Sequence, residues 1–150
     1  MKRHNSLVPL SRQHQKALLT AQLIKKNAPE YRDLPKTAED KKNYVIKFYH
    51  DHLVPHFKAE EEILIPFIKN RSEEIDKVSD EIVEEHLSIR ELILNLETKD
   101  EFINLMDELG YLLENHVRKE ERIWFENIQE VLEEEELQNL SGRLDFSLEK

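Results

Sequence analysis

The stretch HFKAEEEILIPFI at residues 56–68 decides the fold, because it has the spacing of an apolar helix face that also carries a histidine and a glutamate. The glutamate comes four residues after His56, and side chains at that spacing lie on the same side of an α-helix. The pattern returns as HVRKEERIWFENI at residues 116–128, where His116 takes the place of His56. A histidine and a carboxylate that repeat on an inward face predict a polar site inside a helical protein.

Composition favours helices along the whole chain. Of its 150 residues only 2 are glycine and 5 are proline, while 36% are charged, so turn formers are scarce and helix formers are abundant. A chain of this length can bury the core of one domain, and we predict a single domain over residues 1–150. The formal net charge of −10 argues against nucleic-acid binding, and no apolar run is long enough to span a membrane.

The chain contains no cysteine, which excludes disulfides, thiolate ligands and protein-held iron–sulfur clusters. Any metal must therefore be held by nitrogen and oxygen atoms. We expect a cytoplasmic protein.

Apolar residues at three- and four-residue spacing predict four amphipathic helices. They cover about residues 11–27, 38–70 and 72–97, with a fourth apolar stripe over residues 102–128. Ser11, Ser72 and the sequence TKDE at residues 98–101 are the expected N-terminal caps of the first, third and fourth helices. Pro55 and Pro66 are expected to kink the second helix or shift its hydrogen bonds.

The order of these segments predicts the fold class. Mostly short connections between helices favour an all-α protein, an antiparallel up-down four-helix bundle. The sequence EEEELQNLSGRL at residues 133–144 predicts a short C-terminal helix that ends at Gly142.

One histidine falls on the inward stripe of each predicted helix, and these are His14, His56, His86 and His116. In an antiparallel hairpin, residues equidistant from the turn lie at the same level. The midpoints between consecutive histidines are Pro35, Arg71 and Glu101, and each falls on or beside a turn predicted from independent signals. The four histidines are therefore expected in one layer, with Glu60 and Glu120 one helical turn further along.

Taken singly, a histidine on an apolar stripe is more often a hydrogen-bonded core residue, and a glutamate run more often a solvated face. Burying four imidazoles and two carboxylates together without partners costs several kcal/mol per group, and metal cations offset that cost. Imidazole and carboxylate ligands suit iron, manganese or zinc. Six ligands are too many for one tetrahedral zinc and suit two metals that share both carboxylates.

Four segments together make the chain resemble the hemerythrin-like, or HHE cation-binding, domains over nearly its whole length: LSRQHQKALLTAQ, PHFKAEEEILIPFI, VEEHLSIRELI and NHVRKEERIWFENI. The resemblance implies a four-helix bundle around two iron ions, a non-haem diiron centre with oxo or hydroxo and carboxylate bridges. Manganese and zinc are the less favoured metals. By motif position it implies as metal ligands His14, His56, Glu60, His86, His116 and Glu120.

The chain departs from the oxygen-carrying members of that family at two positions. Arg90 stands where those relatives carry a second histidine of the third helix, and Glu121, preceded by Glu120, stands where they place an aspartate. These departures argue against reversible oxygen carriage and make the chain more similar to bacterial members linked to oxygen or nitric oxide response, iron handling and iron–sulfur repair. Helical spacing favours Glu60 over Glu61 as a bridge, and whether Glu61 or Glu121 replaces its neighbour as ligand is left open.

Three functions remain in competition. The first is a metal-dependent protein that binds or senses oxygen, nitric oxide or peroxide, or handles iron. The alternative is a diiron oxidoreductase that detoxifies nitric oxide or peroxide or repairs iron–sulfur clusters, so enzymatic activity is left open. The third is a structural bundle whose polar layer only fixes helix register.

We also expect His52 to line the site behind the ligands, and Arg90 to pair with a carboxylate near it.

Overall fold

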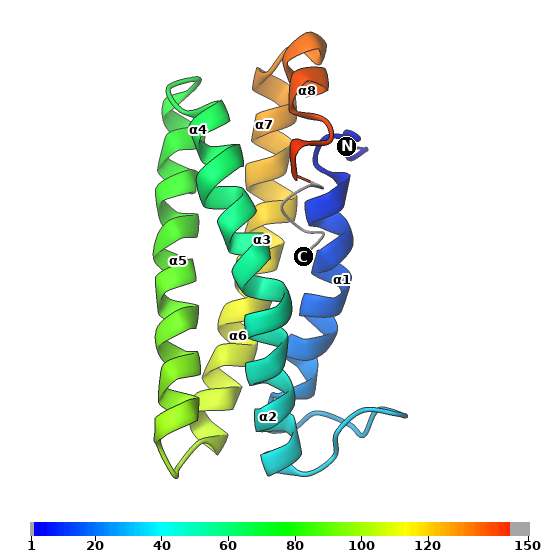
Figure 1. The fold of residues 1–150 in the computed structure, drawn as a ribbon, viewed down its shortest axis with the longest axis vertical. Coiled ribbons are helices and arrows are strands. Elements are labelled where there is room, and N and C mark those ends of the chain that lie inside the picture. Colours follow the sequence, from blue (N-terminus) through cyan, green and yellow to red (C-terminus); the bar gives the residue numbers. More distant parts are fainter. Residues whose placement is uncertain (1, 145–150) are drawn as a thin grey trace.

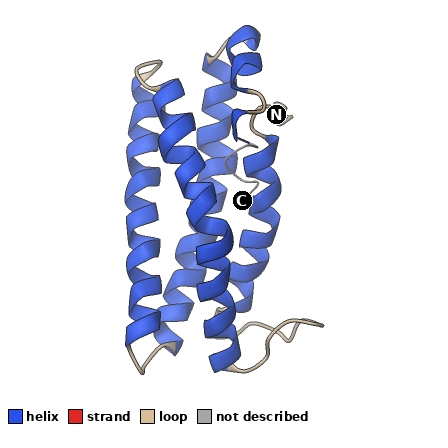
Figure 2. Cartoon of the chain, in the orientation of Figure 1, coloured by secondary structure: helices blue, strands red, loops and turns tan. Residues whose placement is uncertain are grey.

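The chain is helical throughout the part described by the computed structural model, residues 2–144, in which no strand occurs (Figure 2). The prediction of an all-α protein is confirmed. The α-helices are α1 (Val8–Leu23), α2 (Ala38–Phe48), α3 (Val54–Ala59), α4 (Ile65–Ile68), α5 (Glu73–Thr98), α6 (Ile103–Lys119), α7 (Phe125–Val131) and α8 (Glu134–Leu140). Three π-helical segments join some of them, and these are Tyr49–Leu53, Glu60–Leu64 and Glu120–Trp124.

The helices lie along one long axis (Figure 1). Helices α2, α3 and α4 follow one another as a single rod, and so do α6 and α7 (Figure 1). Helix α1 packs against α6, while α5 contacts α6 and α7 as well as α2 and α4. Within residues 2–144, no helix is both long enough and apolar enough to cross a membrane.

Of the three predicted helix caps, one is confirmed. Ser72 has an extended backbone and its hydroxyl accepts the N–H of Ile75 at 3.0 Å, which caps α5. The Ser11 cap is wrong, because α1 already begins at Val8, where the ring of Pro9 costs no helical hydrogen bond. The hydroxyl of Ser11 instead donates to the Glu121 carboxylate at 2.7 Å.

The capping box predicted at residues 98–101 is also wrong. Helix α5 continues through Thr98, whose hydroxyl donates back to the Leu94 carbonyl oxygen at 3.0 Å instead of capping the next helix. Helix α6 begins at Ile103, and its N–H is accepted by the Glu101 carboxylate at 3.1 Å. The helix therefore starts later than the sequence pattern indicates.

The prolines of the second rod are accommodated by π-helical turns. Proline has no N–H to donate and its ring crowds the preceding turn, so a wider turn relieves both constraints. Tyr49–Leu53 precedes Pro55, and Glu60–Leu64 precedes Pro66. The segment Glu120–Trp124 contains no proline, yet it occupies the matching place in the repeated motif. Both glutamates of the repeat thus begin a π-helical turn, a feature often found at functional sites.

A layer of buried histidine and glutamate divides the apolar core into two clusters. On α1, Leu10 belongs to one cluster and Ala17 to the other, with the predicted histidine between them. On α5, Ile82 and Ile89 are divided in the same way. The polar layer is therefore held from both sides by packed apolar side chains.

Helices α1 and α6 approach closely at Gly110. A Cβ atom added there would lie 2.7 Å from the carbonyl oxygen of Ala21 and 2.9 Å from Cγ of Lys25. We expect Gly110→Ala to lower the free energy of unfolding by about 1–3 kcal/mol, because the backbone of α1 must move and this outweighs the better helix propensity of alanine. Chemical denaturation beside Asn115→Ala, an exposed control on the same helix, measures the effect. Equal stability of the two variants would contradict the close approach.

Candidate metal centre

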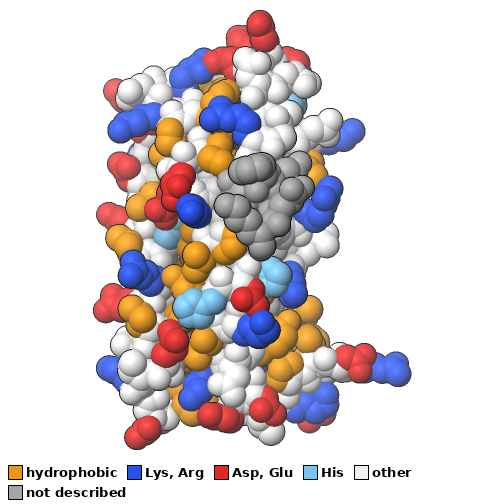
Figure 3. Space-filling model, viewed as in Figure 1, with side chains coloured by type: hydrophobic (Ala, Val, Ile, Leu, Met, Phe, Trp, Pro, Cys, Tyr) orange, Lys and Arg blue, Asp and Glu red, His pale blue; other side chains and the backbone are white. Residues whose placement is uncertain are grey.

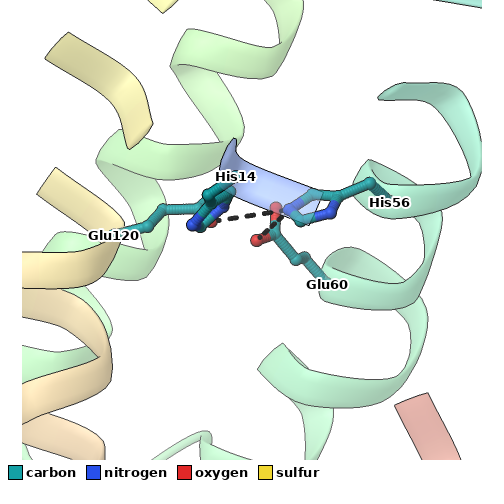
Figure 4. A group of neighbouring side chains, drawn as sticks. All are labelled: His14, His56, Glu60 and Glu120. Carbon is teal, nitrogen blue, oxygen red and sulfur yellow. Dashed lines mark hydrogen bonds and ion pairs between the residues drawn. The ribbon is translucent and has the colours of Figure 1, made fainter. Parts of the chain in front are cut away.

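Six buried side chains meet in the polar layer. The four histidines, one each from α1, α3, α5 and α6, are His14, His56, His86 and His116. The two glutamates are the first residues of two π-helical segments, and these are Glu60 and Glu120. None is more than 4% exposed. Their nitrogen and oxygen atoms form two overlapping groups, in each of which all ligand atoms lie within 4.8 Å of one another: His14, His56, Glu60 and Glu120, and Glu60, His86, His116 and Glu120. Figure 4 shows the first group, with its side chains directed toward one another.

The two carboxylates each face a histidine of both groups. Glu120 places one oxygen 2.9 Å from Nε2 of His14 and the other 2.9 Å from Nε2 of His116. Glu60 places one oxygen 3.1 Å from Nε2 of His56 and the other 3.0 Å from Nε2 of His86. Each carboxylate therefore lies between the two histidine pairs, as a bridging ligand requires.

Several polar atoms at this point have no hydrogen-bond partner among the described residues. They are both carboxylate oxygens of Glu60, Oε2 of Glu120, and Nε2 of His86 and His116. An unsatisfied buried polar group costs about 1–3 kcal/mol, and more when it is charged. Cations placed between the carboxylates and imidazoles would satisfy all of these atoms, so the side chains present fit a metal site.

The outward nitrogens of three histidines are bound by further carboxylates. Nδ1 of His14 lies 2.6 Å from Glu121, Nδ1 of His86 lies 2.5 Å from Glu61, and Nδ1 of His116 lies 2.7 Å from Glu85. An ionised carboxylate only accepts hydrogen bonds, so each of these Nδ1 atoms carries a proton. When such a ring loses its second proton, the lone pair of Nε2 faces inward and can bind a cation.

Glu61 and Glu121, left open from the sequence, therefore lie outside the layer, where they orient histidines. Glu85 was not anticipated from the sequence, because its contact crosses from α5 to α6 and follows from no local spacing.

The fourth histidine differs from the other three. Nδ1 of His56 faces the neutral amide oxygen of Gln13 at 3.4 Å. An amide makes the imidazole a weaker donor to a cation than a carboxylate does. We expect Gln13→Glu to tighten metal binding by the His14 and His56 group on the order of tenfold.

Chelator competition on the purified protein measures this affinity. The matched control is Gln15→Glu, which adds the same charge at an exposed position of α1. Equal effects of the two substitutions would show that charge alone acts, without orientation of His56.

The carboxylates also control the charge of the histidines in the metal-free protein. Burial disfavours the charged ring, but the neighbouring Glu60 and Glu120 outweigh it and raise the pKa of His56 to about 10 and that of His86 to about 10. Burial disfavours a charged Glu120 as well, yet His116 and the surrounding hydrogen bonds hold its pKa well below the usual range. A metal cation must therefore displace protons to bind.

A cavity of about 260 Å³ adjoins the layer on the side of His14, His56 and His116. His52 lines it and is half-buried, which agrees with its expected place behind the ligand candidates. Arg90 is exposed and lines a surface pocket together with Glu61 and His86, but the ion pairs of residues 2–144 do not include it, so its expected pairing with a carboxylate is not seen.

The buried layer of histidine and glutamate side chains fits cations. This layer identifies the helical protein as a metal-binding domain. The family model described as Hemerythrin HHE cation binding domain matches residues 6–128, and the chain belongs to this family. The matched range contains all six side chains of the layer. Comparison with curated proteins and with solved structures gives no match.

Proposed function

We propose that the chain is a non-haem diiron protein built on an antiparallel up-down four-helix bundle, with His14, His56, Glu60, His86, His116 and Glu120 as the metal ligands. The observation that carries the proposal is the position of the two carboxylates, each of which directs one oxygen to each histidine pair. One metal would be held by the pair His14 and His56 and the other by the pair His86 and His116. Glu60 and Glu120 would be shared.

The donor set supports iron or manganese over zinc. Four imidazoles and two carboxylates provide nitrogen and oxygen donors without thiolate, which suits iron or manganese. Zinc favours four ligands in a tetrahedron and would leave donors unused. Iron bound here would supply redox chemistry and an open coordination position.

The small ligand we propose is oxygen, nitric oxide or peroxide, bound or sensed by a cytoplasmic protein. The cavity beside His14 and His56 supports this, because it leads a small molecule to the layer between otherwise packed apolar clusters. The carboxylates that hold Nδ1 of three histidines would keep the rings fixed while such a ligand binds.

Metal analysis with an absorption spectrum tests the proposal. Protein expressed in iron-replete medium and purified in air should contain about two iron ions per chain and show the bands of an oxo-bridged diferric centre. Addition of nitric oxide to the reduced protein should change the spectrum. A folded protein without iron from that medium would refute the diiron assignment, and manganese or zinc at the same stoichiometry would correct the metal alone.

A further inference from the structure

The cavity beside the polar layer is a chamber of its own. Its inner wall consists of buried apolar side chains, and these are Ala17, Phe48, Leu53, Phe57, Leu113 and Val117. Neither Glu60 nor Glu120 lines it. The cavity is therefore separate from the place between the carboxylates, and a molecule inside it would touch only the histidine edge of the layer.

The chamber is larger than a diatomic ligand or peroxide requires. A volume of about 260 Å³ equals roughly nine water molecules at the share each has in the liquid, about 30 Å³. It lies just below the range of about 300–1,000 Å³ typical of small-molecule sites. The volume and the apolar wall suit an organic molecule of roughly ten non-hydrogen atoms.

Positive charge gathers at the rim of this chamber. Arg12 and Lys16 line the cavity one turn apart on α1, and both are exposed to solvent. Neither forms an ion pair with any acidic side chain in the described part of the chain. On the face in Figure 3, histidine, basic and acidic side chains lie beside apolar ones midway along the molecule.

We propose that this cavity binds a medium-chain alkyl carboxylate, with the alkyl tail against the apolar wall and the carboxylate between Arg12 and Lys16. The tail would gain by leaving water, and the head would remain at the rim, where two cations can pair with it. The site goes beyond the proposed diiron function, and no ligand candidate is needed to hold the carboxylate, but the bound tail would occupy the route proposed above for the small ligand.

Calorimetric titration of the protein with octanoate and with octan-1-ol tests the site. We expect saturable binding of octanoate and weaker binding of the alcohol, which has the tail without the charge. Arg12→Glu and Lys16→Glu should each weaken octanoate binding by about tenfold and leave octan-1-ol unchanged. The matched control is Lys69→Glu, an exposed lysine that does not line the cavity.

Filling the chamber provides a second test. Leu113→Trp should abolish binding of both molecules. Circular dichroism will show whether this variant folds, and if it does not, Ala17→Leu fills the cavity with a smaller change. Absence of saturable octanoate binding to the natural sequence, or unchanged binding in the charge-reversal and filled variants, would overturn the site. Iron content measured on the same samples separates this outcome from a failure of the diiron proposal.

Discussion

Glu120→Gln is expected to reduce the metal content from about two ions per chain to nearly none. The substitution keeps the size of the side chain but removes the charge from a group that faces a histidine of both pairs, at 2.9 Å on each side. A neutral amide cannot bridge two cations, and it leaves four imidazoles with a single carboxylate. The loss should therefore affect both metals and not one of them. Elemental analysis after dialysis against a chelator measures it.

Two glutamate variants define what the loss means. Glu121→Gln changes the neighbouring carboxylate, which holds Nδ1 of His14 from outside, and should weaken binding by about 10–100-fold without abolishing it. Glu130→Gln, at an exposed position of α7, should have no effect. If Glu120→Gln retained both metals, the carboxylate would not be a bridge. If Glu121→Gln lost both, the two neighbouring glutamates would have exchanged their expected roles.

The pairing of each histidine with its glutamate could be predicted because one geometric rule determines it. Side chains four residues apart share a helix face, which brings His56 together with Glu60 and His116 with Glu120. The outer partners follow no such local rule, since they reach across to a neighbouring helix. One signal for two of them was present, because both copies of the motif carry a second glutamate directly after the first. Being one residue further along the helix, its side chain points in a different direction and reaches a histidine of another helix.

The helix starts were harder to predict, because residues that suit a cap have other uses. Ser11 has the side chain of a cap, yet its hydroxyl binds Glu121, and the proline two residues earlier already starts the helix. Thr98 bonds to its own helix. Tertiary contacts of this kind compete with local capping, and no sequence pattern shows which one prevails.

The metal-free protein is expected to lose stability as the pH rises from 7 to 10. The unfolded pKa of histidine is about 6.5. In the folded state Glu60 and Glu120 raise the pKa of His56 to about 10 and that of His86 to about 10. Groups with a raised folded pKa contribute stability that is complete below about pH 6.5 and disappears as the pH rises through about 10. Thermal melts in a chelator should show the melting temperature fall by on the order of 5–10 °C across this window.

Metal affinity should rise with pH while the stability of the metal-free protein falls. This contrast distinguishes an effect of the polar layer from a general effect of pH on the protein. A cation binds the unprotonated ring, so its affinity rises over the pH range in which the metal-free protein weakens, and binding releases protons that calorimetry in two buffers can count. His56→Gln should flatten part of the pH dependence of the metal-free melts. Metal-free stability that is constant or increases from pH 7 to 10 would contradict the charged layer. The same two carboxylates therefore keep the histidines protonated in the metal-free state and would hold the metal in the loaded state, which makes proton release an intrinsic part of metal binding.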